Sequence, residues 1–221
     1  MIAIEKDMKF NICLFDLDGT LTDPAVGITN SVMKALERFG ISVNDRSELY
    51  PFIGPPLDYS FKTFYGFSEE NAVLAVKYYR ENYSVNGLFE NEVYNGIPEL
   101  LSELKARGIV LAVATSKPYE FTVRILERFG LIEYFDLIGA ATMDGTISKK
   151  EDVIKTLLDK MVLKDKSTIL MVGDRYHDIE GAKANGLNSA GVLWGYGTEE
   201  ELLKAGADYL VKEPLDILML F

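Results

Sequence analysis

Short runs of apolar and β-branched residues recur through most of the chain, and stretches with helical periodicity separate them. Strands of a parallel sheet that is buried on both faces have this appearance, and the connecting helices are about ten residues long. The pattern therefore predicts an α/β fold built on a parallel sheet. The expected strands are residues 11–15, 109–114, 135–140, 168–172, 189–194 and 209–211. The expected helices between them are residues 119–129, 150–161 and 179–185.

One long segment departs from this rhythm. Between residue 24 and about residue 92 the chain has helical periodicity without a convincing strand. We therefore predict an α/β core domain made of residues 1–22 and 93–221, and an α-helical cap domain, residues 23–92, inserted after the first strand. Ligands of open α/β sheets bind beyond the carboxyl ends of the strands, so the inserted helices are expected to form a lid that opens and closes. The helices expected in the insert are residues 27–39, 57–65 and 69–83, with hinges at residues 22–25 and 91–96.

Reactive side chains follow several of the expected strands or begin an expected helix. Because parallel strands end at the same edge of a sheet, we expect these side chains to converge. The groups are Asp16-Leu17-Asp18-Gly19-Thr20 after the first strand, Thr115-Ser116 after residues 109–114, Lys149-Lys150 at a helix start, and Gly173-Asp174 with Asp178 after residues 168–172.

The first of these groups is the most specific. A lone Asp-x-Asp is most often a turn, since Asp, Gly and Thr are common turn formers. The whole string Asp-x-Asp-Gly-Thr is expected by chance about once in 10⁵ positions at average residue frequencies. The group of Asp174 and Asp178 is weaker alone, because either aspartate is also suited to cap the following helix. Taken singly, the threonine and lysine positions have ordinary structural explanations too.

Carboxylates gathered at one sheet edge would repel one another and raise one another's pKa. A hard divalent cation resolves this repulsion, and Mg²⁺ prefers carboxylate oxygens, water and phosphate as ligands. The cation would also neutralise a bound phosphoryl group. Carboxylates act as nucleophiles in aspartyl-phosphate enzymes, while a hydroxyl and an ammonium group hold phosphoryl oxygens. The ensemble therefore predicts Mg²⁺-dependent hydrolysis of a small phosphorylated metabolite.

At these residues the chain resembles the haloacid dehalogenase (HAD) superfamily, and the similarity covers essentially the whole core. It is carried by residues 16–23, 53–57, 114–118 and 172–174. The insert resembles the C1 type of helical cap, and the strings resemble phosphoglycolate phosphatase-like and 5′-nucleotidase-like members. The resemblance implies a Rossmann-like sheet, a Mg²⁺ cofactor and hydrolysis of a phosphate monoester through an aspartyl-phosphate.

The resemblance also implies roles for the acidic groups. Asp16 would be the nucleophile, and Asp18 would protonate the leaving oxygen and then activate the water. Asp174 would complete the metal site with Asp16 and the main-chain carbonyl of Asp18, with Asp178 as a further ligand or a neighbour of the ligands. His177, the only histidine, is expected in the loop between these two aspartates, at the surface or behind the ligands.

The phosphoryl group would be bound by Thr115, with Ser116 and Gly19 beside it. Lys150 would orient the phosphoryl group. The adjacent Lys149 leaves the choice between the two lysines open, and we favour Lys150 because the run that begins there resembles nucleotidase-like members.

Other functions and substrates stay open at this point. A sugar-phosphate mutase of the same superfamily would share the site, although residues 21–24 resemble the phosphatase-like members instead. A non-catalytic phosphate-binding module would have no need of a poised nucleophile. Phosphoglycolate requires a cation on the insert, such as Lys62 or Arg80, whereas a nucleotide requires a stacking ring. The insert is rich in aromatic residues, but these are also suited to fill the interior of a helical bundle.

Composition narrows the partners further. Acidic residues outnumber basic ones by 34 to 23, and the net charge of −11 disfavours binding to nucleic acid or to an anionic membrane. No apolar stretch is long enough to span a membrane, and charges in the first ten residues argue against a secretory signal. The single cysteine, Cys13, fits a reducing compartment. We expect a cytoplasmic monomer or weak homodimer, with the apolar residues 215–221 packed on the sheet.

Overall fold

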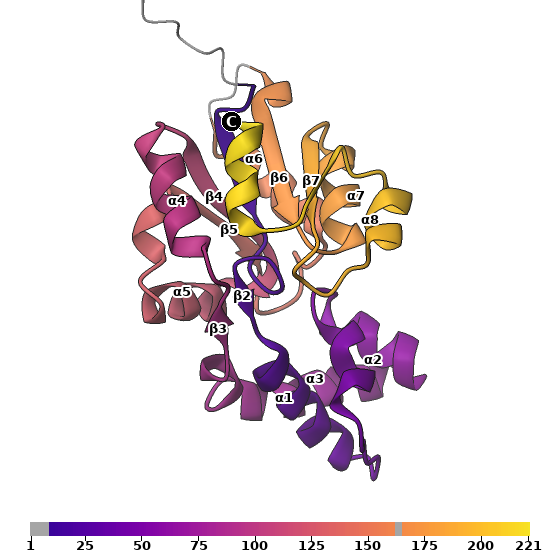
Figure 1. Ribbon diagram of the computed structural model, residues 1–221. Helices are drawn as coiled ribbons and strands as arrows, with labels where there is room; N and C mark the ends of the chain where they lie inside the picture. The colour runs from indigo at the N-terminus through magenta and orange to yellow at the C-terminus, as the bar shows by residue number, and fades with distance from the viewer. Residues whose placement is uncertain (1–8, 162–164) are drawn as a thin grey trace, which may run out of the picture.

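The computed structural model of the chain describes residues 9–161 and 165–221 (Figure 1). Six parallel strands form the main sheet in the order β5-β4-β1-β6-β7-β8. The strands are β1 Ile12–Phe15, β4 Val110–Pro118, β5 Leu137–Ala141, β6 Ile169–Gly173, β7 Asn188–Val192 and β8 Tyr209–Val211. The predicted parallel sheet is confirmed, and its first strand in sequence lies at its centre.

The central strand β1 is buried on both of its faces. Leu14 belongs to an apolar cluster with Leu157 of α6, whereas Phe15 belongs to a second cluster, on the other face, with Ile125 of α5. A strand covered on both faces is apolar throughout, which is the pattern that residues 12–15 display. The helices that cover the two faces are α6 Lys150–Leu158 and α7 Tyr176–Ala184 on the first, and α4 Ile97–Ala106 and α5 Tyr119–Arg128 on the second.

The register of β1 fixes which segments meet beyond its end. Phe15, the last residue of β1, pairs with Val113 of β4 on one side and with Val172 of β6 on the other. The residue that follows β1 is Asp16, so its side chain emerges between the ends of the two neighbouring strands. This arrangement brings Asp16 close to the residues that follow Val172.

Three α-helices of the inserted segment lie together beyond one edge of the sheet (Figure 1). α3 (Glu69–Tyr83) packs against both α1 (Ala25–Glu37) and α2 (Leu57–Tyr65). Aromatic rings fill the interior between them: the ring of Phe61 stacks on that of Phe67 at 5.7 Å between centroids and meets that of Phe52 at 5.1 Å. The elements are α1 Ala25–Glu37, η1 Arg46–Phe52, α2 Leu57–Tyr65, α3 Glu69–Tyr83 and η2 Gly87–Phe89, where η marks a short 3₁₀ helix. We refer to residues 23–92 as the cap; these boundaries are the ones proposed from the sequence.

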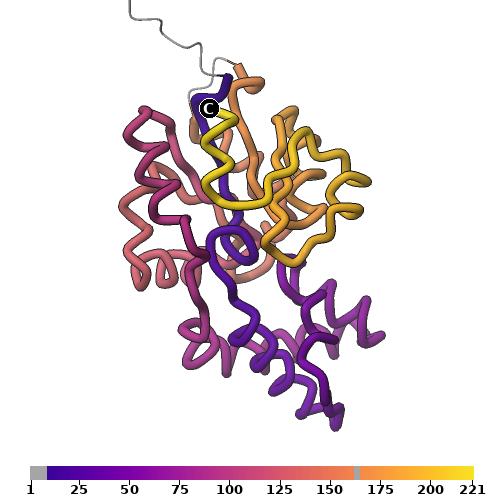
Figure 2. Tube along the Cα trace, viewed as in Figure 1, coloured from indigo at the N-terminus to yellow at the C-terminus, as the bar shows by residue number. Residues whose placement is uncertain are grey.

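A two-stranded antiparallel ribbon joins the cap to the rest of the chain. β2 Thr22–Asp23 pairs with β3 Glu92–Val93. Figure 2 shows the chain passing to and from the cap through these two crossings. The sequence pattern predicts hinges at these positions but no strands, because a two-residue strand has no alternation to detect. Pairing ties the two crossings to each other, so they form one connection rather than two independent linkers; the hinge itself stays a prediction.

Two helices of the structure are absent from the prediction. In α4 the buried residues Ile97, Leu100, Leu101 and Leu104 have helical spacing, so the signal was present in the sequence. The other helix, α8 Glu199–Ala205, packs on α7 and has seven residues, with a single buried position. A helix this short carries too few apolar residues to establish a period.

The C-terminal apolar run packs within the chain, as predicted. It forms η5 Pro214–Leu220, which contacts α4 and β8. Ile217 is buried, and the ring of Phe221 meets that of Phe10 at 5.8 Å between centroids. Within the described part of the chain, no helix combines the length and apolarity that crossing a membrane requires.

Replacing Phe61 by alanine is expected to destabilise the protein by about 3–5 kcal/mol, because the ring is wholly buried in the cap and its removal leaves a cavity. Phe64 lies on the same helix but is 44% exposed, and its replacement by alanine is expected to cost less than about 1 kcal/mol. Urea-induced unfolding followed by circular dichroism measures both values. Equal costs for the two substitutions would contradict this account of the cap interior.

Candidate active site

The turn after β1 brings Asp16 and Asp18 to the edge of the sheet. The main-chain N–H of Asp16 still donates to Val172 of β6 at 2.9 Å, which holds this residue in line with the sheet. Gly19 has a φ of +85°, and a Cβ there would lie 2.3 Å from Asp174 Oδ2. Glycine is therefore required at this position, both for the backbone angle and for the close approach of a carboxylate.

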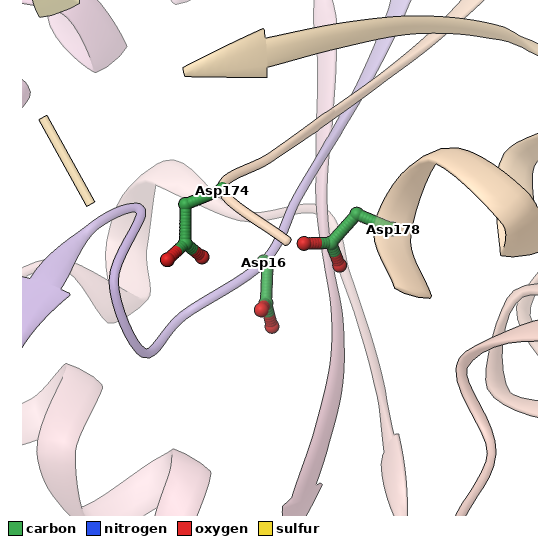
Figure 3. A group of neighbouring side chains, drawn as sticks. All are labelled: Asp16, Asp174 and Asp178. Atoms are coloured by element: carbon green, nitrogen blue, oxygen red, sulfur yellow. The ribbon is translucent and has the colours of Figure 1, made fainter. Parts of the chain in front are cut away.

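Three buried carboxylates meet beyond the ends of β1 and β6. One oxygen each from Asp16, Asp174 and Asp178 lies within 4.8 Å of the others, and Figure 3 shows the three side chains beside one another. Asp174 follows β6 directly, and Asp178 lies in the first turn of α7. A Cβ at Gly173 would lie 2.1 Å from Asp178 Cγ, so this glycine makes room for the third carboxylate. We call these three residues the carboxylate group.

Lys150 supplies the ammonium that faces the carboxylate group. Its Nζ lies 2.7 Å from Asp16 Oδ1 and 2.8 Å from Asp178 Oδ1, and it donates a hydrogen bond to the carbonyl of Ala114 at 2.9 Å. Burial lowers the pKa of Lys150, but the two carboxylates outweigh that effect and hold the pKa above its usual value. Lys149 is exposed and makes no ion pair within the described residues.

The carboxylate group has the properties of a divalent cation site. Burial first, and then Asp178 and Asp16, hold the pKa of Asp174 well above its usual value. Burial likewise raises the pKa of Asp178 to about 6, although Lys150 opposes the shift. Three carboxylates face one ammonium, and a divalent cation would cancel the two negative charges that are left. All these ligands are hard oxygens, so the donor set fits Mg²⁺.

Asp18 lies apart from the carboxylate group and pairs with Lys117 instead. Its Oδ2 accepts a hydrogen bond from Lys117 Nζ, and its Oδ1 is buried without a hydrogen-bond partner among the described residues. Burial raises the pKa of Asp18, while Lys117 acts in the opposite direction. These contacts concern the side chain of Asp18. The use of its main-chain carbonyl as a metal ligand stays a prediction.

Lys117 is the main site residue that the sequence analysis missed. The sequence pattern leaves Lys117 between the expected strand 109–114 and the expected helix 119–129, but β4 continues to Pro118 with an irregular register between Thr115 and Pro118. This irregularity turns the lysine inward, where its ammonium lies 4.8 Å from the ring centroid of Tyr83 in the cap. Only the position directly after Thr115 and Ser116 hinted at such a role.

Thr115 and Ser116 follow at the end of β4. Thr115 is buried, and its Oγ1 accepts a hydrogen bond from the main-chain N–H of Lys117 at 3.2 Å. Ser116 lines a cleft together with Lys117 and Asp18. The structure thus gathers residues from all four predicted segments at one edge of the sheet, whereas Lys149 is exposed.

The cleft lies between the cap and the sheet edge and has a volume of about 760 Å³. Asp18 and Lys117 line it on the core side. On the cap side its lining is mixed: aromatic and aliphatic side chains (Phe52, Leu57, Val76, Tyr79 and Tyr83) stand beside charged ones (Asp58, Glu69, Lys77, Arg80 and Glu81).

The two cap cations proposed as carboxylate ligands differ in placement. Arg80 lines the cleft, and its Nη1 donates to the carbonyl of Met143 in the core at 2.9 Å. Lys62 is not among the residues that line the cleft. Its ammonium instead forms ion pairs with Asp58 at 3.3 Å and Glu69 at 3.0 Å. Only Arg80 is therefore placed to meet a ligand in this cleft.

His177 lies inside α7 rather than in a loop, so that part of the prediction is wrong. Its ring meets the ring of Tyr59 of the cap at 6.5 Å between centroids. Burial, with Arg175 and Lys150 nearby, lowers the pKa of His177 to about 4. The imidazole is therefore neutral at pH 7.

Several known proteins are similar to this chain in sequence and fold. A sequence model of the family described as haloacid dehalogenase-like hydrolase matches residues 13–192. A 5′-nucleotidase of Pseudomonas aeruginosa is 49% identical over 195 residues, which cover 88% of each chain. The tyrosine-protein kinase PtkA of Mycobacterium tuberculosis is 40% identical over 188 residues, which cover 84% of this chain and 63% of that protein. A solved structure described as a predicted phosphatase from Clostridium acetobutylicum has a TM-score of 0.92 at 48% identity, over 95% of this chain and 99% of that one.

The environment of His177 generates a pH dependence of stability. Its pKa is about 4 in the folded protein and about 6.5 in an unfolded chain. Between these values the unfolded chain binds the proton more readily, so this residue reduces stability as the pH falls from 7 to 5. The melting temperature of His177→Gln, measured by differential scanning fluorimetry, is expected to fall less over this range than that of the wild type. Parallel curves for the two proteins would rule out the neutral, buried imidazole.

Proposed function

Because the chain belongs to the haloacid dehalogenase-like hydrolase family, as a phosphatase-type member, we propose that it hydrolyses small phosphate monoesters in a Mg²⁺-dependent reaction through an aspartyl-phosphate on Asp16. One observation carries the proposal: Lys150 holds the buried carboxylate of Asp16 beside those of Asp174 and Asp178. An arrangement so rich in negative charge suits a site that binds a cation and, through it, a phosphate.

The first half of the proposed reaction transfers the phosphoryl group to the protein. A carboxylate oxygen of Asp16 attacks phosphorus, and the bond between phosphorus and the ester oxygen breaks. Asp18 donates its proton to the departing oxygen. Burial raises the pKa of Asp18, and a shift in this direction favours the role of a general acid. Lys117 keeps the Asp18 side chain oriented toward the cleft.

The second half returns the phosphoryl group to water. Asp18, now a carboxylate, takes a proton from a water molecule, and the water oxygen attacks phosphorus. The bond between phosphorus and Asp16 breaks, inorganic phosphate leaves, and the Asp16 carboxylate is restored. Thr115 and Ser116 are proposed to donate hydrogen bonds to the phosphoryl oxygens, with Gly19 beside them. A Mg²⁺ ion bound to the carboxylate group would supply the charge that neutralises these oxygens.

A nucleoside monophosphate suits the cleft better than phosphoglycolate. A volume of about 760 Å³ lies within the range of sites for drug-sized ligands and far exceeds the needs of a two-carbon acid. The aromatic and aliphatic residues of the cap wall offer surface to a base. Of the two cap cations proposed for a carboxylate, Lys62 is paired outside the cleft, and Arg80 lines the cleft but donates to the carbonyl of Met143. The name of the P. aeruginosa relative supports the same choice. We therefore propose 5′-nucleotides as the substrate class.

Replacing Lys150 by methionine is expected to lower the turnover number by about 100-fold or more, because the Asp16 carboxylate loses the ammonium that orients it. Lys149→Met is the matched control and is expected to retain activity within about twofold, since Lys149 is exposed. Release of p-nitrophenol from p-nitrophenyl phosphate in the presence of Mg²⁺ measures both. EDTA and Asp16→Asn should each stop the release. Equal losses for the two lysine variants would move the phosphate-orienting role away from Lys150.

Two alternative functions would give different outcomes when phosphate esters are supplied as substrates. A mutase would interconvert sugar phosphates without net release of phosphate, and a non-catalytic module would bind a phosphate ester without turnover. Steady release of inorganic phosphate excludes both.

The substrate class is tested by narrowing the cleft. Val76 lines it from α3, and Val76→Trp is expected to lower kcat/KM for 5′-nucleotides by about tenfold or more, while small esters such as p-nitrophenyl phosphate still fit. Val85 is 67% exposed and lies outside the cleft lining, so Val85→Trp serves as the control. Wild-type kcat/KM should also be at least about tenfold higher for nucleotides than for 2-phosphoglycolate. A preference for 2-phosphoglycolate would overturn the assignment.

A further inference from the structure

Tyr196 contacts both the carboxylate group and the hinge of the cap. It lies in the loop after β7, and its main-chain N–H donates to Asp174 Oδ2 at 2.8 Å. Its side chain extends away from that contact, and the hydroxyl donates to Asp23 Oδ1 in β2. One residue thus connects a proposed metal ligand to the hinge strand.

The loop around Tyr196 is closely fitted to Asp174. A Cβ at Gly195 would lie 2.3 Å from Asp174 Cβ, and one at Gly197 would lie 1.9 Å from the Asp174 carbonyl oxygen. Both neighbours of Tyr196 are therefore positions at which only glycine allows the observed approach. Trp194 also anchors this loop, because its Nε1 donates to the carbonyl of Thr20 at 3.0 Å. The main chain of the loop is therefore packed and hydrogen-bonded directly against Asp174.

The other end of Tyr196 is fitted to the cap. Asp23 Oδ1, which accepts from the Tyr196 hydroxyl, also accepts from the main-chain N–H of Ala25, the first residue of α1, at 3.0 Å. The Tyr196 ring meets the ring of Tyr50 in η1 at 5.5 Å and 64°. Both contacts join this core loop to segments that would have to move when the cap opens.

We propose that Tyr196 is a positioning residue that couples divalent cation binding at the carboxylate group to the seating of the cap on its hinge. This inference rests on the proposed function, because it takes the carboxylate group as the cation site. A cation that fixes the Asp174 carboxylate also fixes the Tyr196 N–H, and through the ring it fixes the hydroxyl that holds Asp23. Coupling of this kind is reciprocal, so a seated cap also strengthens cation binding.

The main chain and the side chain of Tyr196 make separate contacts, so the two can be tested independently. The contact to Asp174 uses the main chain and survives a change of side chain. The contact to Asp23 uses the hydroxyl alone. Tyr196→Phe therefore removes the connection and leaves both the loop and the carboxylate group intact. Tyr50→Phe is the matched control, since the Tyr50 ring packs on Tyr196 but its hydroxyl makes no hydrogen bond within residues 9–161 and 165–221.

Isothermal titration of Mg²⁺ into the substrate-free protein gives the first readout. Tyr196→Phe is expected to raise the Mg²⁺ dissociation constant about fivefold, at the low end of typical coupling between sites, and Tyr50→Phe is expected to leave it unchanged. Hydrogen exchange of the hinge strands, residues 22–23 and 92–93, gives the second readout. Mg²⁺ should slow this exchange in the wild type and in Tyr50→Phe, but not in Tyr196→Phe.

The outcomes separate this proposal from the proposed function. Equal Mg²⁺ affinity and equal hinge protection in Tyr196→Phe and the wild type would overturn the coupling while leaving the hydrolase intact. Coupling observed in a protein that releases no phosphate from any ester would support the linkage and remove the proposed reaction. Failure of the wild type to bind Mg²⁺ would overturn both.

Discussion

The mutual repulsion of three buried carboxylates is the constraint on which the rest of the structure depends. Asp16, Asp174 and Asp178 meet within 4.8 Å in a region closed to solvent, where charges are poorly screened. Lys150 offsets part of this cost by contacting two of them. The glycines at 19, 173 and 195 permit the approach, because any side chain there would occupy the space of a carboxylate. The negative charge that Lys150 leaves unopposed could be neutralised by a bound cation.

The sheet topology explains how this cluster and the cap come to share one place. The central position of β1 sets the end of that strand between β4 and β6, so residues from distant parts of the chain meet without any long loop. The chain then leaves for the cap through β2 and returns through β3, which pair with each other. Insertion directly after β1 therefore places the helices of the cap across the cleft from Asp18 and Lys117. Because the cap is inserted after the central strand, the cleft forms beside the end of that strand.

The sequence allowed the strands, most helices and the convergence of the acidic residues to be predicted, because continuous apolar runs and rare motif strings are local signals. Contacts made by side chains across the fold left no such signal. Lys117 is turned inward by an irregularity of β4, and Tyr196 is defined by contacts to Asp174 and Asp23 that no periodicity reveals. Both residues contact partners that lie far away in the chain, and a pattern along the sequence does not identify such partners.

The contacts that hold the cap against the core are of a kind suited to repeated opening. Three arginines donate to main-chain carbonyls across the boundary: Arg175 to Ile53 at 2.8 Å, Arg80 to Met143 at 2.9 Å, and Arg124 to Ser84 at 3.3 Å. When such a contact breaks, water satisfies both the guanidinium and the carbonyl, so the net cost is about that of one hydrogen bond rather than that of stranding a buried charge. The carboxylate group has no such substitute, because its three carboxylates are buried and Lys150 supplies the charge that opposes them. The fold therefore keeps its buried charges at the ends of the central strands and its water-replaceable hydrogen bonds at the boundary with the cap.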